Sequence, residues 1–349
     1  MPVRGVREVD CETPRSRWDL QTLASRSVAI PPGEEAFTPH CKYYAAVGIV
    51  CSISTNFEPL LGAAGEALLS VAAEATADLR LTFWVDTQST ARAPWPRPYF
   101  RGLNHLVFAA YSPEDAMLID LAQRRAIGRF SAAMAADRSY WKQVIFPALL
   151  GVMGASAGVT ALHCGCVVRN GAGLLLAGDS GSGKSTLALA LCKSGFDLLA
   201  DDWTYLTTRS GRLAAWGLPT ALKLLPDART FFPELRWLET TASLNGELAY
   251  EIDPEVVFGV RRSSSCQPRC VVFLERGGKS SFSIAEMSST EAARRFESLL
   301  EDLPAELSHY RVPQDEAIRQ LVARPCRVLR YAEGPEAVAW SLRLYCENL

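Results

Sequence analysis

The chain has 349 residues, 48% of them hydrophobic, and a nearly balanced formal charge of −2. This length allows a sizeable buried core and favours two domains, while the weak charge argues against a nucleic acid as partner. The ten cysteines lack the spacing of a disulfide framework, and the N-terminus carries charges where a signal peptide needs its apolar core. We therefore expect a cytoplasmic protein.

The first part of the chain predicts an arm and a small domain. Residues 1–38 are polar and dotted with proline, which predicts a flexible N-terminal arm. Over 39–135 the sequence predicts an α+β domain with a helix at 60–77 and strands at 46–53, 79–85, 105–109 and 116–120. Alternating apolar residues predict a sheet with one wet face. No motif in this domain points to catalysis.

A helix predicted over 136–153 opens the second domain, which we place at 136–349. The segment 144–168 has no acidic or basic residue and is long enough to span a bilayer. Pro147, several small residues and His163 favour instead a buried helix, a turn and a strand at 159–168. We therefore expect no membrane partner.

A glycine-rich loop follows an apolar strand predicted over 173–177 and precedes a helix predicted over 185–193. The loop fits the pattern G-x-x-x-x-G-K-[ST] with Gly178, Asp179, Ser180, Gly181, Ser182, Gly183, Lys184 and Ser185. In such loops the backbone amides and the lysine hold nucleotide phosphates, the serine hydroxyl binds Mg²⁺, and the helix N-terminus adds positive potential. The pattern predicts a nucleotide-binding site, and we assign the next residue, Thr186, to the same site.

Two adjacent carboxylates, Asp201 and Asp202, follow a strand predicted over 196–200. Ligands of open α/β sheets lie at the carboxyl ends of strands. There one carboxylate can hold Mg²⁺ while the other accepts a proton from an attacking hydroxyl. The alternative is that both residues only begin a polar turn.

His163 lies within the predicted strand at 159–168. On its own it is either a satisfied strand residue or a catalytic group. The neighbouring Cys164 and Cys166 form C-x-C without a second ligand pair, which is weak support for zinc, so we predict no zinc site.

The remaining chain alternates short strands with irregular segments. Strands are predicted at 203–208 and 213–216, and 226–268 reads as irregular. Within it, 259–268 predicts a mobile basic loop, in which Arg261 and Arg262 either close over a phosphate or face solvent. The C-terminal elements are a strand at 270–276, a helix at 288–301 opened by a capping box, a strand at 326–331 and a helix from Pro335.

Together these motifs resemble the catalytic domain of the HPr kinase/phosphorylase family. The likeness covers about residues 160–203. It includes Leu162-His163, a loop that opens with Gly-Asp-Ser-Gly, and Ala200-Asp201-Asp202, with Asp201 following Lys184 by 17 positions. The resemblance implies an α/β fold, namely a P-loop catalytic domain of the HPr-kinase/PEP-carboxykinase-like type behind the smaller α+β domain.

The resemblance also implies a role for each residue. Lys184 and the loop amides would hold the β- and γ-phosphates of ATP, with Ser185 and Asp202 on Mg²⁺. Asp201 would be the general base that takes a proton from a serine hydroxyl, and His163 would lie beside Asp201 and tune it. A carboxylate next to a bound phosphate can act as base with little further covalent machinery.

Two departures from the family bear on the acceptor. Thr186 stands where glutamate is typical, and the signature Glu-x-Arg-Gly-x-Gly has no counterpart, since the segment 215–223 lacks both its glutamate and its arginine. The chain is therefore more similar to divergent HPr-kinase-like proteins, some of which phosphorylate a serine of a ribosomally made peptide such as a lasso-peptide precursor. We predict an ATP- and Mg²⁺-dependent kinase of a serine on a peptide or small protein, with a homo-oligomer compatible with the resemblance.

Two other functions fit the same motifs. A kinase of a small hydroxylated metabolite, or a relative of the carboxykinases, would keep the site and change the acceptor, because a phosphate loop says nothing about the nucleophile. A nucleotide-binding regulatory module with little turnover would use the loop to switch a partner.

Overall fold

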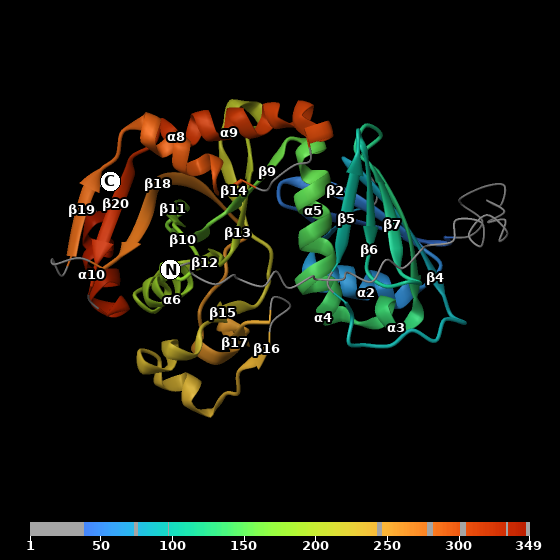
Figure 1. Cartoon of the computed structure of the whole chain (residues 1–349), viewed down its shortest axis with the longest axis horizontal. Coiled ribbons are helices and arrows are strands. Elements are labelled where there is room, and N and C mark those ends of the chain that lie inside the picture. Colours follow the sequence, from blue (N-terminus) through green and yellow to red (C-terminus); the bar gives the residue numbers. More distant parts are fainter. Residues whose placement is uncertain are drawn as a thin grey trace, which may run out of the picture. The chain divides into compact units, whose positions relative to one another are not determined.

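The computed structural model describes residues 38–72, 76–96, 98–242, 246–277, 282–300, 305–332 and 334–346. The chain divides into the units Met1–Ala36 and Phe37–Leu349, and the described residues all belong to the second unit (Figure 1). The predicted arm at 1–38 lies outside the described residues, apart from its last position. The unit is a mixed α/β structure with several sheets.

The first sheet takes its strands from the N-terminal half of the unit. Among the described residues its strand order is β3-β1-β2-β4-β8-β7-β6-β5. The bounds are β1 His40–Ala46, β2 Ile49–Thr55, β3 Leu69–Val71, β4 Leu79–Asp86, β5 Tyr99–Leu103, β6 Leu106–Ala110, β7 Ala116–Asp120 and β8 Arg125–Ser131. Burial alternates residue by residue along β4, so one face of this strand is buried and the other is wetter, as the sequence pattern predicts.

Two predictions in this half are wrong. The run 46–53 is not one strand, because Val47 and Gly48 turn with positive φ between β1 and β2. The helix predicted over 60–77 is α2 Glu58–Ala67, which passes at Leu68 into extended backbone and then into β3. Since β3 pairs with β1, strand pairing prevails over the helix propensity of the alanine-rich sequence. Strands β5 and β8 were not predicted.

The helix predicted over 136–153 consists of consecutive short pieces. They are α3 Ala132–Ala136, α4 Arg138–Tyr140, a π-helical turn Trp141–Ile145 and α5 Phe146–Gly154. Trp141 is fully buried, with ring centroids 5.2 Å from Phe83 and 5.0 Å from Phe130. No helix in the described part of the chain has both the length and the apolar character needed to cross a membrane.

The second sheet follows this helical segment. Its described strands run in the order β12-β10-β11-β18-β14-β13-β9, with β20 beside β18 and β19 beside β20. The bounds are β9 Val159–His163, β10 Gly165–Arg169, β11 Ala172–Ala177, β12 Asp197–Ala200, β13 Trp203–Thr207, β14 Ala214–Trp216, β18 Ser265–Arg276, β19 Phe282–Glu286 and β20 Cys326–Tyr331. Strands β11, β18 and β20 are parallel.

The strand predicted over 159–168 is in fact two strands, broken at Cys164. Strand β9 pairs with β13, whereas β10 pairs with β11 and β12. The carbonyl oxygen of Cys164 accepts a hydrogen bond from the Thr204 hydroxyl (2.8 Å). A Cβ atom at Gly165 would lie 3.0 Å from the carbonyl oxygen of Asp201, so glycine permits this close approach.

The segment 226–268, predicted as irregular, is largely ordered secondary structure. It contributes β16 Thr241–Ala242 and β17 Leu248–Ile252, which join β15 Leu222–Leu224 in a small sheet, and α7 Pro254–Phe258. Strand β18 begins at Ser265 and so takes in part of the predicted loop at 259–268.

The two arginines of that predicted loop have different surroundings. Arg262 has a side chain only 15% exposed and donates to the carbonyl oxygen of Thr220 (2.7 Å). Arg261 forms an ion pair with Asp197 (2.9 Å). Arg262 is therefore held in place and largely buried, whereas the Arg261 side chain is 78% exposed and faces solvent, one of the two outcomes expected for it.

Helices cover the second sheet. They are α6 Lys184–Lys193, α8 Ser289–Glu297, α9 Val312–Val322 and α10 Pro335–Cys346. Half of the predicted capping box is seen: the Ser288 side chain accepts from the Glu291 backbone N–H, while the Glu291 carboxylate bonds Arg294 and Arg295. The helix it opens ends at Glu297, before the predicted end at 301.

Candidate active site

Sheet topology brings the predicted motifs to one edge. Strands β11 and β12 are both antiparallel to β10 and therefore parallel to each other. The ends of β11 at Ala177 and of β12 at Ala200 thus lie at the edge where β10 begins, just after His163. The phosphate loop, the two aspartates and His163 meet there, as the sequence predicts for residues at the carboxyl ends of strands.

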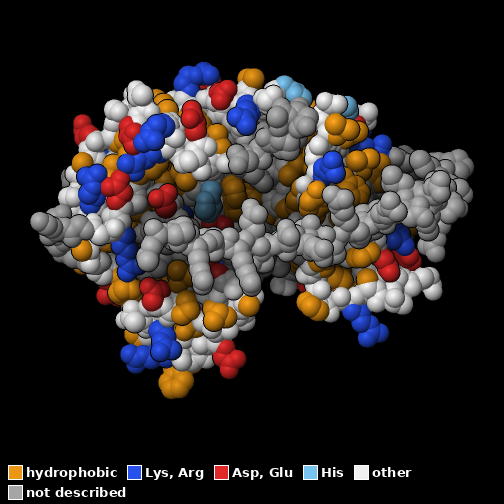
Figure 2. Space-filling model, in the orientation of Figure 1, with side chains coloured by type: hydrophobic (Ala, Val, Ile, Leu, Met, Phe, Trp, Pro, Cys, Tyr) orange, Lys and Arg blue, Asp and Glu red, His pale blue; other side chains and the backbone are white. Residues whose placement is uncertain are grey.

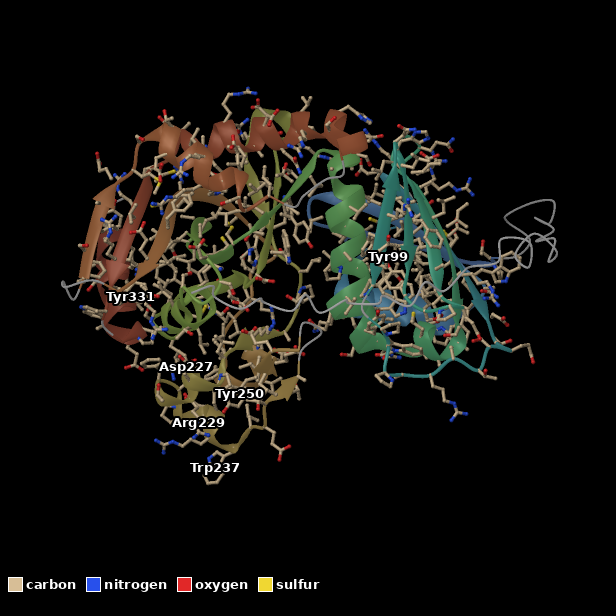
Figure 3. All side chains as sticks on the ribbon, in the orientation of Figure 1. Tyr99, Asp227, Arg229, Trp237, Tyr250 and Tyr331 are labelled. Carbon is tan, nitrogen blue, oxygen red and sulfur yellow. The ribbon has the colours of Figure 1, made fainter. Side chains whose placement is uncertain are left out.

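Two glycines of the loop are required by its packing. Gly178 has φ +145°, and a Cβ there would lie 2.9 Å from the carbonyl oxygen of Leu274. Gly183 has φ +92°, and its Cβ would lie 2.5 Å from the Tyr331 hydroxyl. That hydroxyl donates to the carbonyl oxygen of Ser182 (2.6 Å), so the end of β20, where Figure 3 labels Tyr331, is bonded to the loop.

The loop presents donors to a phosphate. Helix α6 starts at Lys184 without a side-chain cap, which leaves its first N–H groups for a ligand. The Lys184 ammonium is held over the loop by the carbonyl oxygens of Gly178 (2.8 Å) and Asp179 (3.1 Å). Within the described residues the buried Ser182 hydroxyl has no hydrogen-bond partner. The exposed rim is Asp179, Ser180 and Gly181, and Thr186 lies half-buried in the first helical turn.

Replacing Gly183 with alanine is expected to weaken ADP binding about 10- to 100-fold, because the Cβ strains the backbone and meets the Tyr331 hydroxyl. Isothermal titration calorimetry measures this. Gly181→Ala is the matched control: it also has positive φ (+77°), but nothing lies within 4 Å of its Cβ, so it should weaken binding less. Adding Tyr331→Phe to Gly183→Ala should restore part of the affinity. Equal affinities in the Gly183→Ala variant and the wild type would contradict this account.

Asp201 is buried beneath the loop. Its Oδ2 accepts a hydrogen bond from the Lys223 backbone N–H (3.0 Å), and the nearby Ser185 hydroxyl lowers the pKa of this carboxyl group. Its Oδ1 is buried with no partner among the described residues. Burial raises the pKa of Asp201 to about 6, against the opposing effect of the Lys223 and Ser185 hydrogen bonds.

The unpaired oxygen of Asp201, next to the Ser185 hydroxyl, fits a hard divalent cation such as Mg²⁺, which prefers oxygen ligands. In the described part of the chain, no group of three or more His, Cys, Asp or Glu side chains could hold a metal by itself. In phosphoryl-transfer sites Mg²⁺ usually takes substrate phosphate oxygens as further ligands.

Asp202 has the opposite environment. Its side chain is 62% exposed, and its Oδ1 lies 2.6 Å from Nε2 of His163. The partial burial of Asp202 raises its pKa, but the His163 hydrogen bond and the charges of His163, Lys184 and Lys223 outweigh this, so its pKa is below the ordinary value. The His163 ring also packs on Trp203, with centroids 5.2 Å apart.

The expected partners of the two aspartates are thus exchanged. The resemblance implied that His163 lies beside Asp201 and that Asp202 joins Ser185, whereas His163 contacts Asp202 and Ser185 contacts Asp201. The reason is strand register: β9 and β13 pair His163 with Trp203, which places the imidazole next to the residue that precedes Trp203.

Lys223 also lies at the site, although no sequence motif assigns it a role. It belongs to β15, its backbone N–H bonds Asp201, and its ammonium is 3.1 Å from Glu247. The only signal was its place at the end of the segment 215–223, where the family signature was sought. Arg261 and Arg262, by contrast, are anchored elsewhere.

Comparison with known proteins finds a family likeness over the residues of this site. The family model described as HPr Serine kinase C-terminal domain matches residues 155–223, which include His163, the phosphate loop and both aspartates. The solved Hpr(Ser) kinase/phosphatase from Coxiella burnetii is similar over 54% of this chain and 91% of its own, with 13% identity and a TM-score of 0.30. No curated protein matches the chain. Residues 155–223, which build most of the candidate active site, are therefore similar to the C-terminal domain of HPr serine kinases.

Proposed function

We propose that the protein is an ATP- and Mg²⁺-dependent kinase that phosphorylates a serine hydroxyl of a peptide or small protein. One observation carries the proposal: an exposed carboxylate, Asp202, paired with His163, lies at the same sheet edge as the phosphate loop. A plain nucleotide-binding module does not need a carboxylate held open to a second substrate, whereas a kinase does.

The two aspartates divide the work according to their surroundings. Asp201 and Ser185 are the residues to hold Mg²⁺, because the Asp201 carboxylate is buried, keeps one oxygen unpaired and lies against the serine hydroxyl. When bound, Mg²⁺ neutralises charge on the phosphate oxygens. Lys184 and the N-terminal N–H groups of α6 bind and orient those phosphates.

Asp202 is then the general base. It takes the proton of the acceptor hydroxyl while the hydroxyl oxygen bonds to the γ-phosphorus and ADP leaves with the electrons of the broken P–O bond. His163 fixes the orientation of this carboxylate through the contact at 2.6 Å. This assignment exchanges the base and metal roles that the resemblance implied for Asp201 and Asp202.

The acceptor class follows from exposure. Because 62% of the Asp202 side chain is open, a serine on a chain segment can approach it without entering a closed cavity. Basic and acidic side chains are interspersed on the face shown in Figure 2, which is not the uniformly basic surface typical of nucleic-acid binding. We propose a ribosomally made precursor peptide as the first acceptor to test, in the cytoplasm, with a homo-oligomer compatible with this function.

The test combines the full chain, Mg²⁺ and γ-labelled ATP with a degenerate peptide library that has one fixed serine. The same library with alanine at that position, and the Lys184→Ala variant, are the controls. We expect phosphoserine by mass spectrometry only with the serine library and the wild-type chain. Label that appears only in a small-molecule extract would support a metabolite kinase instead. Tight ATP binding with no phosphoproduct from either acceptor would support a regulatory module.

A further inference from the structure

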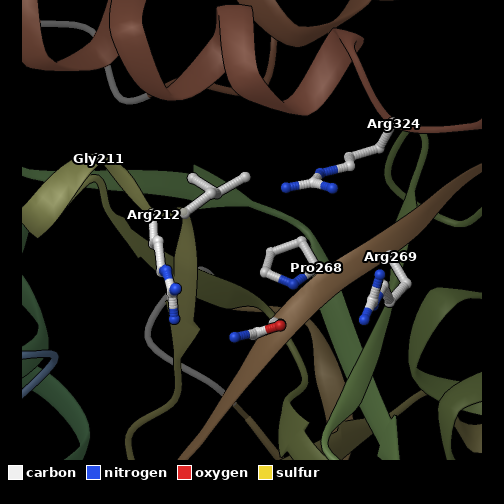
Figure 4. A pocket seen from close by; sticks show the side chains of 7 residues that line it. Gly211, Arg212, Pro268, Arg269 and Arg324 are labelled. Carbon is white, nitrogen blue, oxygen red and sulfur yellow. The ribbon is translucent and has the colours of Figure 1, made fainter.

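A second basic site lies apart from the phosphate loop. It is a cavity of about 240 Å³ lined by the turn between β13 and β14, the start of β18 and the end of α9 (Figure 4). Its lining residues are Gly211, Arg212, Leu213, Gln267, Pro268, Arg269 and Arg324. Three separate segments of the chain thus each bring an arginine to one cavity, and Figure 4 shows these arginines around Pro268.

The three arginines lack acidic partners. Among the described residues, no carboxylate forms an ion pair with Arg212, Arg269 or Arg324. Other arginines of this unit do form ion pairs with acidic side chains, among them Arg261, Arg295, Arg327 and Arg330. The Nε atom of Arg324 is buried and has no hydrogen-bond partner in the part of the chain that the structure describes. The positive charges of three arginines that line one cavity have no described carboxylate to balance them, and a buried N–H without an acceptor is unfavourable. Both conditions are relieved by an anion.

Strand direction separates this cavity from the active site. Strand β18 runs parallel to β11, with Pro268 opposite Gly173 and Phe273 opposite Ala177. The cavity therefore lies where these strands begin, whereas the phosphate loop lies where β11 ends. At the rise of an extended strand, the two sites are roughly 17 Å apart. The cavity is not a part of the nucleotide site.

We propose that this cavity is a second anion site that binds a phosphate group, either free or carried by a small metabolite. Guanidinium groups match phosphate oxygens through paired N–H donors, and three of them supply the charge for a dianion. The volume is below the 300–1,000 Å³ range of drug-sized pockets, which suits a phosphate with at most a short organic part. The inference goes beyond the proposed kinase function and does not rest on it.

The test uses the full chain saturated with Mg²⁺ and a non-hydrolysable ATP analogue, so that the phosphate loop is already filled. Inorganic phosphate is titrated by calorimetry at constant ionic strength. We expect binding that weakens at least tenfold in the Arg212→Gln/Arg269→Gln double variant. Both side chains are exposed, so the fold should be kept. Arg236→Gln, at another exposed arginine outside the cavity, is the matched control and should bind as the wild type does.

A parallel titration with glycerol 3-phosphate distinguishes the two sources. Tighter binding than that of inorganic phosphate identifies a phosphorylated metabolite, and equal or weaker binding identifies free phosphate. The proposal is overturned if the double variant binds phosphate as tightly as the wild type, if the saturated wild type binds no phosphate, or if a short acidic peptide binds where phosphate does not.

Discussion

Asp202→Asn is expected to lower the turnover number of phosphoryl transfer by about 10²- to 10⁴-fold, the usual contribution of a general base. The amide keeps the size of the carboxylate and can still meet His163 Nε2, but it cannot accept the proton of the acceptor hydroxyl. Because Asp202 is exposed and lies outside the phosphate loop, ADP affinity should change little. Steady-state kinetics with a serine peptide, together with calorimetry for ADP, measures both quantities.

The control for this prediction is the imidazole beside the carboxylate. His163→Gln keeps a hydrogen-bonding side chain next to Asp202 and should reduce turnover less than Asp202→Asn does, because it removes the orienting group and leaves the base. An Asp202→Asn variant that transfers phosphate as fast as the wild type would show that Asp202 is not the base. The role implied by the resemblance, with Asp201 as base, would then regain support.

The burial of Asp201 predicts an unusual dependence of stability on pH. Its pKa is raised to about 6 in the folded chain, from an ordinary value of 3.8, by burial. Such a group contributes its full stabilisation of the fold below about pH 4, where it is protonated. This contribution is lost as the pH rises through 6, because the carboxyl group must then ionise while it is buried. With a chelator present, the free energy of unfolding of Asp201→Asn should therefore rise by about 2–3 kcal/mol relative to that of the wild type when the pH is raised from 4 to 7.5.

Thermal unfolding at the two pH values measures this as a relative rise of several degrees in Tm. The matched control is Asp202→Asn, which changes the neighbouring carboxylate. The pKa of Asp202 is lowered, so its ionised form stabilises the fold. At pH values above the ordinary pKa range of carboxyl groups, Asp202→Asn should therefore lower the Tm, whereas Asp201→Asn should raise it. Equal pH dependence of Tm in the two variants would contradict the assigned environments.

Mg²⁺ separates the two aspartates in the same assay. With ADP present, Mg²⁺ should raise the Tm of the wild type and of Asp202→Asn through binding to the folded state, but should raise that of Asp201→Asn much less. An undiminished response of Asp201→Asn to Mg²⁺ would show that Asp201 does not hold the cation.

Local patterns in the sequence located the elements that carry the site. The phosphate loop between an apolar run and a helix of good formers, and the aspartate pair after a second apolar run, stand as β11, α6 and β12 in the structure. These signals are contiguous, so neighbouring residues alone determine them. The strand at 326–331 and the helix from Pro335 were found for the same reason.

Longer-range pairing decided what the sequence missed. An alanine-rich stretch favours helix locally, yet β3 forms there because β1 offers it a partner. The uncharged run at 159–168 looks continuous, yet it divides at Cys164 between two sets of partner strands. Partners distant in the sequence leave no mark within the segment itself, so its composition cannot reveal them.

The sequence by itself determined that this chain carries a phosphate loop and two carboxylates at a strand end, because spacing along the chain sets both. Only the tertiary structure decided the surroundings of each carboxylate. The β9–β13 register places His163 against Asp202, while burial beneath the loop places Asp201 against Ser185. Adjacent residues of identical type differ here only in their surroundings, and surroundings are a property of the folded chain.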